Sequence, residues 1–466
     1  MNVPAFFRSR GALLTVLILT SLLPIQVLPV SIADGKPRTA PAGEPHIRDE
    51  NAAQPIRAPG APAGEDHSPE SLSHKDRQDV FEEVWKRINE KYYDSTFHGV
   101  NWRALHDSYR PRIDIAKNDY EFYSLLNDMI GKLHDAHTRL HTPLERQERE
   151  RSQAVTVGAS IDEIEGKAVI VQVEPDSDAA RAGVEPGMIV SAIDGVAAQD
   201  KLRELRGAIG GSSTERAVQL RLYHKMLDGD PGTRVSLKLI RGDGTQFSAT
   251  LMRRTVSDAP RIVSRWLPSG YGYLKLTLWK SPIHDQFKTY LEKFREAPGL
   301  IVDLRGNPGG EVNEVLKIAG YFFATKVPFG RFVTRSGKNL DLYTGRDGDP
   351  VYGGPVAILV NEASGSGSEM FSGVMQESGR AIVIGRQSCG CLLGISQYKK
   401  LKGGAELAIS ELGYVSPRGR RLEGVGVIPD EAVSLTLADL QRRRDATIEG
   451  AESALGTHLK TSNGPH

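Results

Sequence analysis

The sequence predicts a multidomain α/β protein, and three observations support this. At roughly 150 residues per domain, 466 residues are enough for about three domains. A content of 39% hydrophobic and 25% charged residues is typical of globular proteins. The hydrophobic spacing is helical at first, becomes a series of short β-runs near residue 154, and alternates between strands and helices from residue 256.

Residues 1–33 have the layout of a secretory signal peptide. Arg8 and Arg10 precede an uncharged apolar run, 11–23, and Ser31 and Ala33 fit a cleavage after Ala33. We expect cleavage, and therefore a periplasmic or extracellular protein with no stable membrane insertion. The protein would be membrane-anchored only if the segment stayed uncleaved. Residues 34–75 contain seven prolines without apolar periodicity, which predicts a disordered linker.

Charge and cysteine content exclude some classes of protein. Lys and Arg (59) balance Asp and Glu (58), which argues against a nucleic acid partner. The two cysteines, Cys389 and Cys391, are too few and too close for a disulfide framework. As an i, i+2 pair they are also poor metal or disulfide partners, and we expect one of them to pack inside.

Residues 76–150 predict a small helical region. Val80, Val84 and Ile88 recur at four-residue spacing, as one buried helical face requires, and a second apolar run covers 122–133. The region ends in a histidine-rich turn, 134–138.

Residues 154–255 predict a strand-rich domain, with β-runs at 168–173, 188–193 and 235–240 that end in turn residues. The stretches VTVGASIDEIEGKAVIVQVEPDSDAARAGVEPGMIVSAIDGV and GDPGTRVSLKLIRGDG resemble the PDZ domain of the carboxyl-terminal processing (tail-specific) proteases. The resemblance implies that backbone around Val157, Gly158 and Ala159 receives the C-terminal carboxylate of a substrate. The peptide would add as a strand beside Ser160 and Ile161. A scaffold domain in which Gly158 only forms a turn is the alternative.

Residues 256–435 predict an α/β domain with a nucleophile at a strand-to-helix junction. A strand at 300–304 leads into the glycine-rich turn 305–310, and a buried strand at 356–360 leads through 361–369 into a helix. Ser366 lies between two glycines at this junction. A tight turn there exposes a hydroxyl, and the helix N-terminus offers N–H groups to an oxyanion.

The strings DLRGNPGG, NEASGSGSE and EGVGVIPD resemble the same protease family, and the resemblance extends from about 76 to 435. It implies a crotonase-like α/β serine peptidase domain with Ser366 as nucleophile. Gly367 and either Gly309 or Gly310 would form the oxyanion hole. In the alternative interpretation these serines only cap a helix, which suits Ser364 or Ser368 better than Ser366.

The sequence departs from the family at the general base. Most members have a lysine where this chain has Cys391, and Lys399 and Lys400 lie roughly 25 Å further along an extended chain. Relatives that resemble tricorn protease use a Ser-His-Glu triad. That resemblance implies His137 as the base and Glu423 as its orienting carboxylate.

Other histidine assignments fit less well. His134 is a weaker candidate for the base. His134, His137 and His141 with Asp135 could hold zinc on one helical face, but the HExxH string is absent, so we expect neither a metal nor a cofactor.

The sequence therefore predicts an exported serine endopeptidase that cleaves proteins or peptides selected by their free C-termini. The alternative is an inactive PDZ-bearing adaptor, because the lysine position is Cys391. The amphipathic tail, 436–466, could pack on the core or join subunits into an oligomer, and packing is the default expectation.

Overall fold

The computed structural model describes residues 71–208, 210–345 and 351–462, all within the compact unit Asp66–His466. The predicted signal peptide, 1–33, and residues 34–70 of the predicted linker lie outside the described residues. None of the helices within the described ranges is long and apolar enough to cross a membrane.

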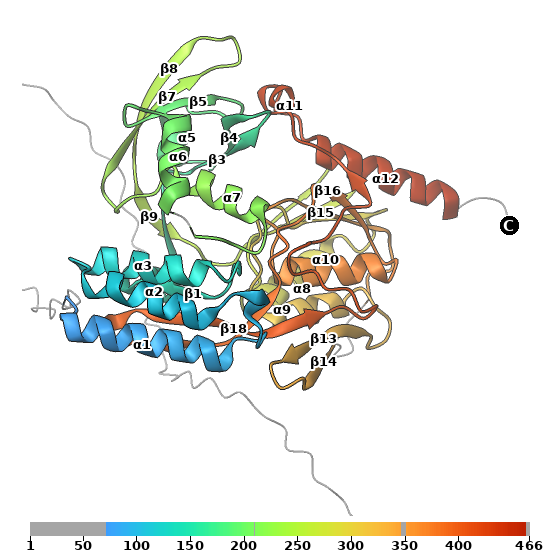
Figure 1. Cartoon of the computed structure of the whole chain (residues 1–466). Helices are drawn as coiled ribbons and strands as arrows, with labels where there is room; N and C mark the ends of the chain where they lie inside the picture. Colours follow the sequence, from blue (N-terminus) through green and yellow to red (C-terminus); the bar gives the residue numbers. More distant parts are fainter. Residues whose placement is uncertain (1–70, 209, 346–350, 463–466) are drawn as a thin grey trace, which may run out of the picture. The chain divides into compact units, whose positions relative to one another are not determined.

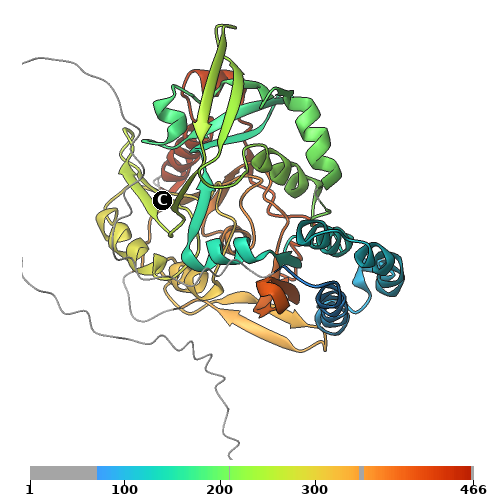
Figure 2. The ribbon, with the colours of Figure 1, turned by 90° about the vertical axis from the view of Figure 1, so that its left-hand side faces the viewer.

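Three helices form the first region: α1 (His74–Lys91), α2 (Trp102–Asp114) and α3 (Asp119–Gly131), with the short 3-10 helix η1 (Phe97–Gly99) after α1. They lie side by side in both views (Figures 1 and 2). The α1 helix begins inside the expected linker, because Ser73 and Asp76 form a reciprocal capping box. Val80, Val84 and Ile88 are buried, as their spacing predicts.

A five-stranded sheet completes this helical region with residues from far along the chain. Its order is β1-β18-β13-β14, and β17 also pairs with β18. Leu401, Leu407 and Ile409, from β18 and the turn before it, enter the core of the helical region. Residues 76–150 therefore do not form an independent core. The bounds are β1 (Arg139–His141), β13 (Pro328–Thr334), β14 (Asn339–Tyr343), β17 (Leu393–Lys400) and β18 (Glu406–Val415), with helix α4 (Pro143–Arg151) after β1 and the 3-10 helix η2 (Lys402–Gly404) before β18.

The strand-rich domain begins and ends in one antiparallel pair, β2 (Gln153–Thr156) with β9 (Arg254–Ser257). Between them lies a sheet of order β3-β4-β5-β7-β8, with β6 paired to β5. The α7 helix packs against β3, which pairs only with β4 among the described strands. The bounds are β3 (Ala159–Ile164), β4 (Lys167–Val173), α5 (Asp178–Arg181), β5 (Ile189–Ile193), β6 (Val196–Ala197), α6 (Ala198–Ala208), α7 (Glu215–Lys225), β7 (Arg234–Ile240) and β8 (Gln246–Met252).

The third region is built on a sheet of order β10-β11-β12-β15-β16-β19, parallel from β11 onward. One face, with Val302 and Ile358, packs on α8, α9 and α10. The other face, with Ile301 and Leu359, packs on α12. Because both faces are covered, the central strands are continuous apolar runs. The bounds are β10 (Ile262–Trp266), β11 (Gly272–Leu276), α8 (Ile283–Lys293), β12 (Leu300–Asp303), α9 (Val312–Gly320), β15 (Val356–Val360), α10 (Gly367–Glu377), β16 (Ile382–Gly385) and β19 (Glu431–Ala432).

The C-terminal tail packs on the core, through α11 (Leu437–Gln441) and α12 (Ala446–Ser462). Ala451 and Leu455 of α12 lie in the apolar cluster on the parallel sheet. Arg305 pairs with Asp445 just before α12 and with the fully buried Asp303 at the end of β12. This ion pair connects the tail to the glycine-rich turn.

Candidate active site

Two glycine-rich turns meet at one edge of the parallel sheet because they follow the neighbouring strands β12 and β15. Asn307 joins them. Its main-chain oxygen accepts from Gly365 N–H at 3.1 Å and from the Ser368 hydroxyl at 3.0 Å. Its side chain donates to the Leu276 carbonyl oxygen and is fully buried. The two sequence motifs therefore form one rigid site.

Ser366 differs from the two serines on either side of it. Ser364 and Ser368 are fully buried, and their hydroxyls donate to the main-chain oxygens of Leu304 and Asn307. Ser366 is partly exposed and has a φ of 48°, in the left-handed region that non-glycine residues seldom adopt. Such strain at the first turn of α10 is typical of an exposed nucleophile.

The main-chain amides around Ser366 have different roles. Gly309 N–H donates to Asn307 Oδ1 at 2.9 Å and is buried, so it is not free to bind a substrate oxygen. Gly310 N–H and Gly367 N–H have no acceptor within the described parts of the chain. A Cβ at Gly367 would lie 3.6 Å from Gly310 N, which shows that these two glycines are neighbours. Of the alternatives Gly309 and Gly310, the geometry favours Gly310.

Glu369 organises the backbone around Ser366, and sequence reasoning did not single it out. Its buried carboxylate accepts hydrogen bonds from Ser366 N–H (3.0 Å) and from Cys391 N–H (3.0 Å). It also accepts from Gly390 N–H (2.6 Å) and from the Ser388 hydroxyl (2.6 Å). Burial raises the pKa of Glu369 to about 7, against the effect of these four donors. A charged residue three positions after the serine, in the first turn of the helix, was the available signal.

Cys389 and Cys391 form a disulfide, so the expectation that they are poor disulfide partners was wrong. Their Cα atoms are 5.2 Å apart, within the range that a disulfide spans. Gly390, with a φ of 72°, lets the chain fold back between them. Both cysteines are buried, and Ala136 and Ala217 pack against them.

His137 lies on the loop after Ala136, which contacts the cysteine pair. Its Nδ1 atom is buried and has no hydrogen-bond partner among the described residues. Burial lowers the pKa of His137, and the nearby charge of Asp135 acts in the opposite direction. Asp135 also accepts the His137 main-chain N–H at 2.8 Å. The imidazole is therefore held neutral near a carboxylate.

Glu423, the predicted orienting carboxylate, is not hydrogen-bonded to His137 in this structure. Its carboxylate accepts instead from Leu392 N–H at 2.5 Å, directly after the disulfide. Burial raises the pKa of Glu423 to about 8, and the charge of Asp135 contributes to this rise. Glu423 thus lies close enough to Asp135 for the charge of Asp135 to affect its pKa.

The other two histidines are separated by the fold. His134 is exposed and adopts a φ of 51° in the turn before His137. His141 lies on β1, where burial lowers its pKa to about 3 and Arg139 donates to its Nε2. Within the ranges that the structure describes, no three His, Cys, Asp or Glu side chains are grouped as metal ligands.

The residues predicted to bind a peptide lie at the start of β3. Val157 is buried, and Ala159, Ser160 and Ile161 belong to the strand edge beside α7. Gly158 has a φ of 78°, and a Cβ there would lie 2.0 Å from Ser177 Cβ, so this position requires glycine. Gly158 N–H already donates to Thr156 Oγ1 at 2.9 Å.

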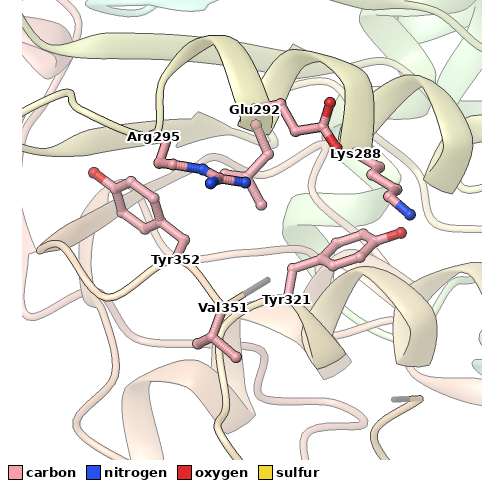
Figure 3. A pocket seen from close by; sticks show the side chains of 7 residues that line it. Lys288, Glu292, Arg295, Tyr321, Val351 and Tyr352 are labelled. Carbon is pink, nitrogen blue, oxygen red and sulfur yellow. The ribbon is translucent and has the colours of Figure 1, made fainter. Parts of the chain in front are cut away.

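One hollow in the described structure is lined by the predicted site residue Glu423, and another is lined by none of the predicted site residues. A cavity of about 460 Å³ adjoins Glu423 and Leu393, and Tyr93, Asp94, His98 and Arg421 also line it. A smaller pocket between α8 and the residues after the gap at 346–350 contains none of the predicted site residues (Figure 3). Its lining comprises Lys288, Leu291, Glu292, Arg295, Tyr321, Val351 and Tyr352.

Comparisons with known proteins agree with this architecture. Residues 270–433 match the model of Peptidase family S41, and residues 73–131 match that of the Tricorn protease C1 domain. The carboxyl-terminal-processing protease of Synechocystis sp. is 26% identical over 407 residues, covering 83% of this chain and 88% of the relative. The chloroplastic carboxyl-terminal-processing peptidase 2 of Arabidopsis thaliana is 28% identical over 383 residues, covering 78% and 70%.

Solved structures share the fold. The photosystem II D1 C-terminal processing protease aligns with a TM-score of 0.54 at 22% identity, covering 82% of this chain and 97% of that chain. Mature CPAF aligns with a TM-score of 0.64 at 14% identity, covering 84% and 99%. Together, the sequence matches show that the chain is similar to carboxyl-terminal-processing proteases and indicate that it is a serine-type peptidase.

Proposed function

We propose that the chain is an exported endopeptidase that cleaves peptide bonds through an acyl-enzyme at Ser366. The observation that carries the proposal is the contrast among three serines. Ser364 and Ser368 are buried and hydrogen-bonded, whereas Ser366 is partly exposed, strained and next to two unpaired amides. A structural cap would need none of these properties.

In the proposed first step, Ser366 Oγ attacks the carbonyl carbon of the scissile bond. His137 takes the hydroxyl proton, and the N–H groups of Gly310 and Gly367 donate to the oxygen that becomes negative. His137 then protonates the leaving amine, and water later cleaves the ester in the same manner. The burial that lowers the pKa of His137 supports this role, because only the neutral imidazole accepts a proton.

The orienting carboxylate has to act on His137 Nδ1, which is buried and lacks a partner within the part of the chain that the structure describes. We keep Glu423 in this role as a proposal. Its support is electrostatic, since Asp135 perturbs the pKa values of both Glu423 and His137. Substrate binding would have to bring the Glu423 carboxyl onto Nδ1.

We also propose that substrates are captured by their free C-termini through strand addition to β3. The position of β3 at the end of its sheet supports this, because the outer edge of β3 has no strand partner among the described residues. A peptide with a free C-terminal carboxylate should therefore have a lower KM than the same peptide amidated. Equal kinetics would leave residues 157–161 without a role in capture.

Covalent labelling by a fluorophosphonate tests the central proposal. Wild-type protein should be labelled at Ser366, identified by mass spectrometry of the modified peptide, and Ser366→Ala should not be labelled. Ser378→Ala is the matched control, because Ser378 is exposed at the other end of α10. Absence of labelling in folded wild-type protein would favour the inactive adaptor.

A further inference from the structure

The disulfide between Cys389 and Cys391 closes a loop of only three residues. Such a short cross-link restricts the unfolded chain far less than a long one, so a large contribution to global stability is not expected. The chain contains no other cysteine. The effect of the cross-link is therefore concentrated on the backbone of 389–391.

That backbone is hydrogen-bonded to the nucleophile. Ser366 N–H lies 3.0 Å from the main-chain oxygen of Cys391. Ser366 N–H and Cys391 N–H also share one oxygen of Glu369, each at 3.0 Å. A change in the conformation of the cysteine loop would alter the positions of the Ser366 amide and, with it, the strained turn that exposes the hydroxyl.

The same loop contacts the other parts of the site. Cys389 N–H donates to the Ser364 main-chain oxygen at 3.0 Å, and the Thr214 hydroxyl donates to the Cys389 main-chain oxygen at 2.7 Å. Ala136, the neighbour of His137, packs against the cysteine side chains. The loop thus borders the nucleophile and the segment that carries the proposed base.

We propose that Cys389-Gly390-Cys391 is a thiol–disulfide modification site that controls the peptidase, active when oxidised and impaired when reduced. The reductant is a dithiol. One of its thiolates attacks a cysteine sulfur and breaks the S–S bond, giving a mixed disulfide and one cysteine thiolate. The second thiolate of the reductant attacks the mixed disulfide and releases the other cysteine. Two electrons and two protons pass to the protein, and the reductant leaves as a disulfide.

Access to the sulfur atoms is limited, since Cys389 is 8% and Cys391 is 5% exposed. Thr214 and Ala217, at the start of α7, form part of the cover. Exchange therefore requires this contact to open, and its rate should rise when Thr214→Val removes the hydroxyl that donates to Cys389. This inference rests on the proposed function, because the controlled activity is that of Ser366.

The test compares full-length protein after dithiothreitol and after oxidised glutathione, with fluorophosphonate labelling of Ser366 as readout. Reduction should lower the labelling rate about tenfold, the effect of roughly one lost hydrogen bond in the transition state, and reoxidation should restore it. Alkylation under denaturing conditions should count two thiols in the reduced protein and none in the oxidised protein. Cys389→Ser/Cys391→Ser should label at the reduced rate and not respond to dithiothreitol.

The outcomes separate the two proposals. Equal labelling of fully reduced and fully oxidised wild-type protein overturns the redox proposal and leaves the proposed function intact, and so does a response of the double variant to dithiothreitol. Two free thiols in the oxidised protein also overturn it. No labelling in either state refutes the proposed function together with its redox control. If the double variant does not fold, Cys389→Ser, which cannot form the bond, replaces it, with the thermal transition as a check of folding.

Discussion

The substitution Gly310→Ala examines how tightly the glycine-rich turn is fitted to its surroundings. An added Cβ would lie 2.1 Å from the main-chain oxygen of Trp279 and 2.8 Å from its carbonyl carbon, and the φ of Gly310 is 139°. Gly306→Ala is a matched control in the same turn. Gly306 also has a positive φ, of 80°, but a Cβ there meets no atom of the described residues within 4 Å.

The magnitude follows from the difference between these two sites. Gly306→Ala should cost about 1–2 kcal/mol, because an alanine is held in the left-handed region. Gly310→Ala adds an overlap that only main-chain movement can relieve, worth about 1–3 kcal/mol more. The Trp279 main chain is hard to displace, because the Trp279 side chain is fully buried and its Nε1–H donates to the Ser368 hydroxyl. If the turn moves instead, the Gly310 N–H leaves its place and labelling should fall about 10²–10³-fold, as for loss of an oxyanion donor.

The assay measures the thermal transition and the rate of fluorophosphonate labelling for wild type, Gly306→Ala and Gly310→Ala. We expect Gly306→Ala to retain most of the labelling rate at a slightly lower melting temperature. Gly310→Ala should lose at least about 10² in rate relative to this control. Rates within about threefold of each other, with equal melting temperatures, would refute the close fit at Gly310 and its assignment as an oxyanion donor.

Three further outcomes are expected. His137→Ala should lower the labelling rate by at least about 10³ with an unchanged melting temperature, and His134→Ala should label like wild type; the reverse result would exchange their roles. Because burial lowers the pKa of His137, the acid limb of kcat/KM should lie below about pH 6.5, and a limb above about pH 8.5 would contradict an imidazole base. Burial raises the pKa of Glu423 from 4.5 to about 8, so the folded protein binds this proton more tightly than the unfolded chain. The stabilising effect of this bound proton is complete below pH 4.5 and is lost as the pH rises to 8. The fall in melting temperature between pH 5 and 8.5 should therefore be smaller in Glu423→Gln than in wild type.

The strand and turn positions around the nucleophile could be predicted because their signals are local. The apolar run Val356–Val360 coincides with β15, and a glycine-flanked serine in the turn between this strand and the next helix had to occupy the edge where parallel strands end. The meeting of this turn with the 305–310 turn follows from the pairing of β12 with β15.

The disulfide and the surroundings of Glu423 could not be predicted because they depend on distant contacts. Cys389 and Cys391 approach each other in a loop that folds around the buried Glu369 carboxylate. An irregular loop of this kind has no periodic sequence pattern from which it could be predicted. The α7 helix was missed for a related reason. It buries Ala217 and Val218 as well as Leu222 and Tyr223, against more than one neighbour, so no single apolar stripe marks it.

The pairing of β2 with β9 has a consequence for the modular history of the chain. Thr156 lies opposite Arg254, so the two ends of the strand-rich domain are adjacent, and a two-residue turn could replace everything between them. Geometrically, the domain is an insertion that a gene could gain or lose in one event. Yet its loss would remove the Thr214 hydroxyl, which donates to the main-chain oxygen of Cys389, and the Arg216 guanidinium, which donates to that of Ser388. A chain that gained this domain also gained a support for its nucleophile loop, and a chain that lost it would need a replacement for that support.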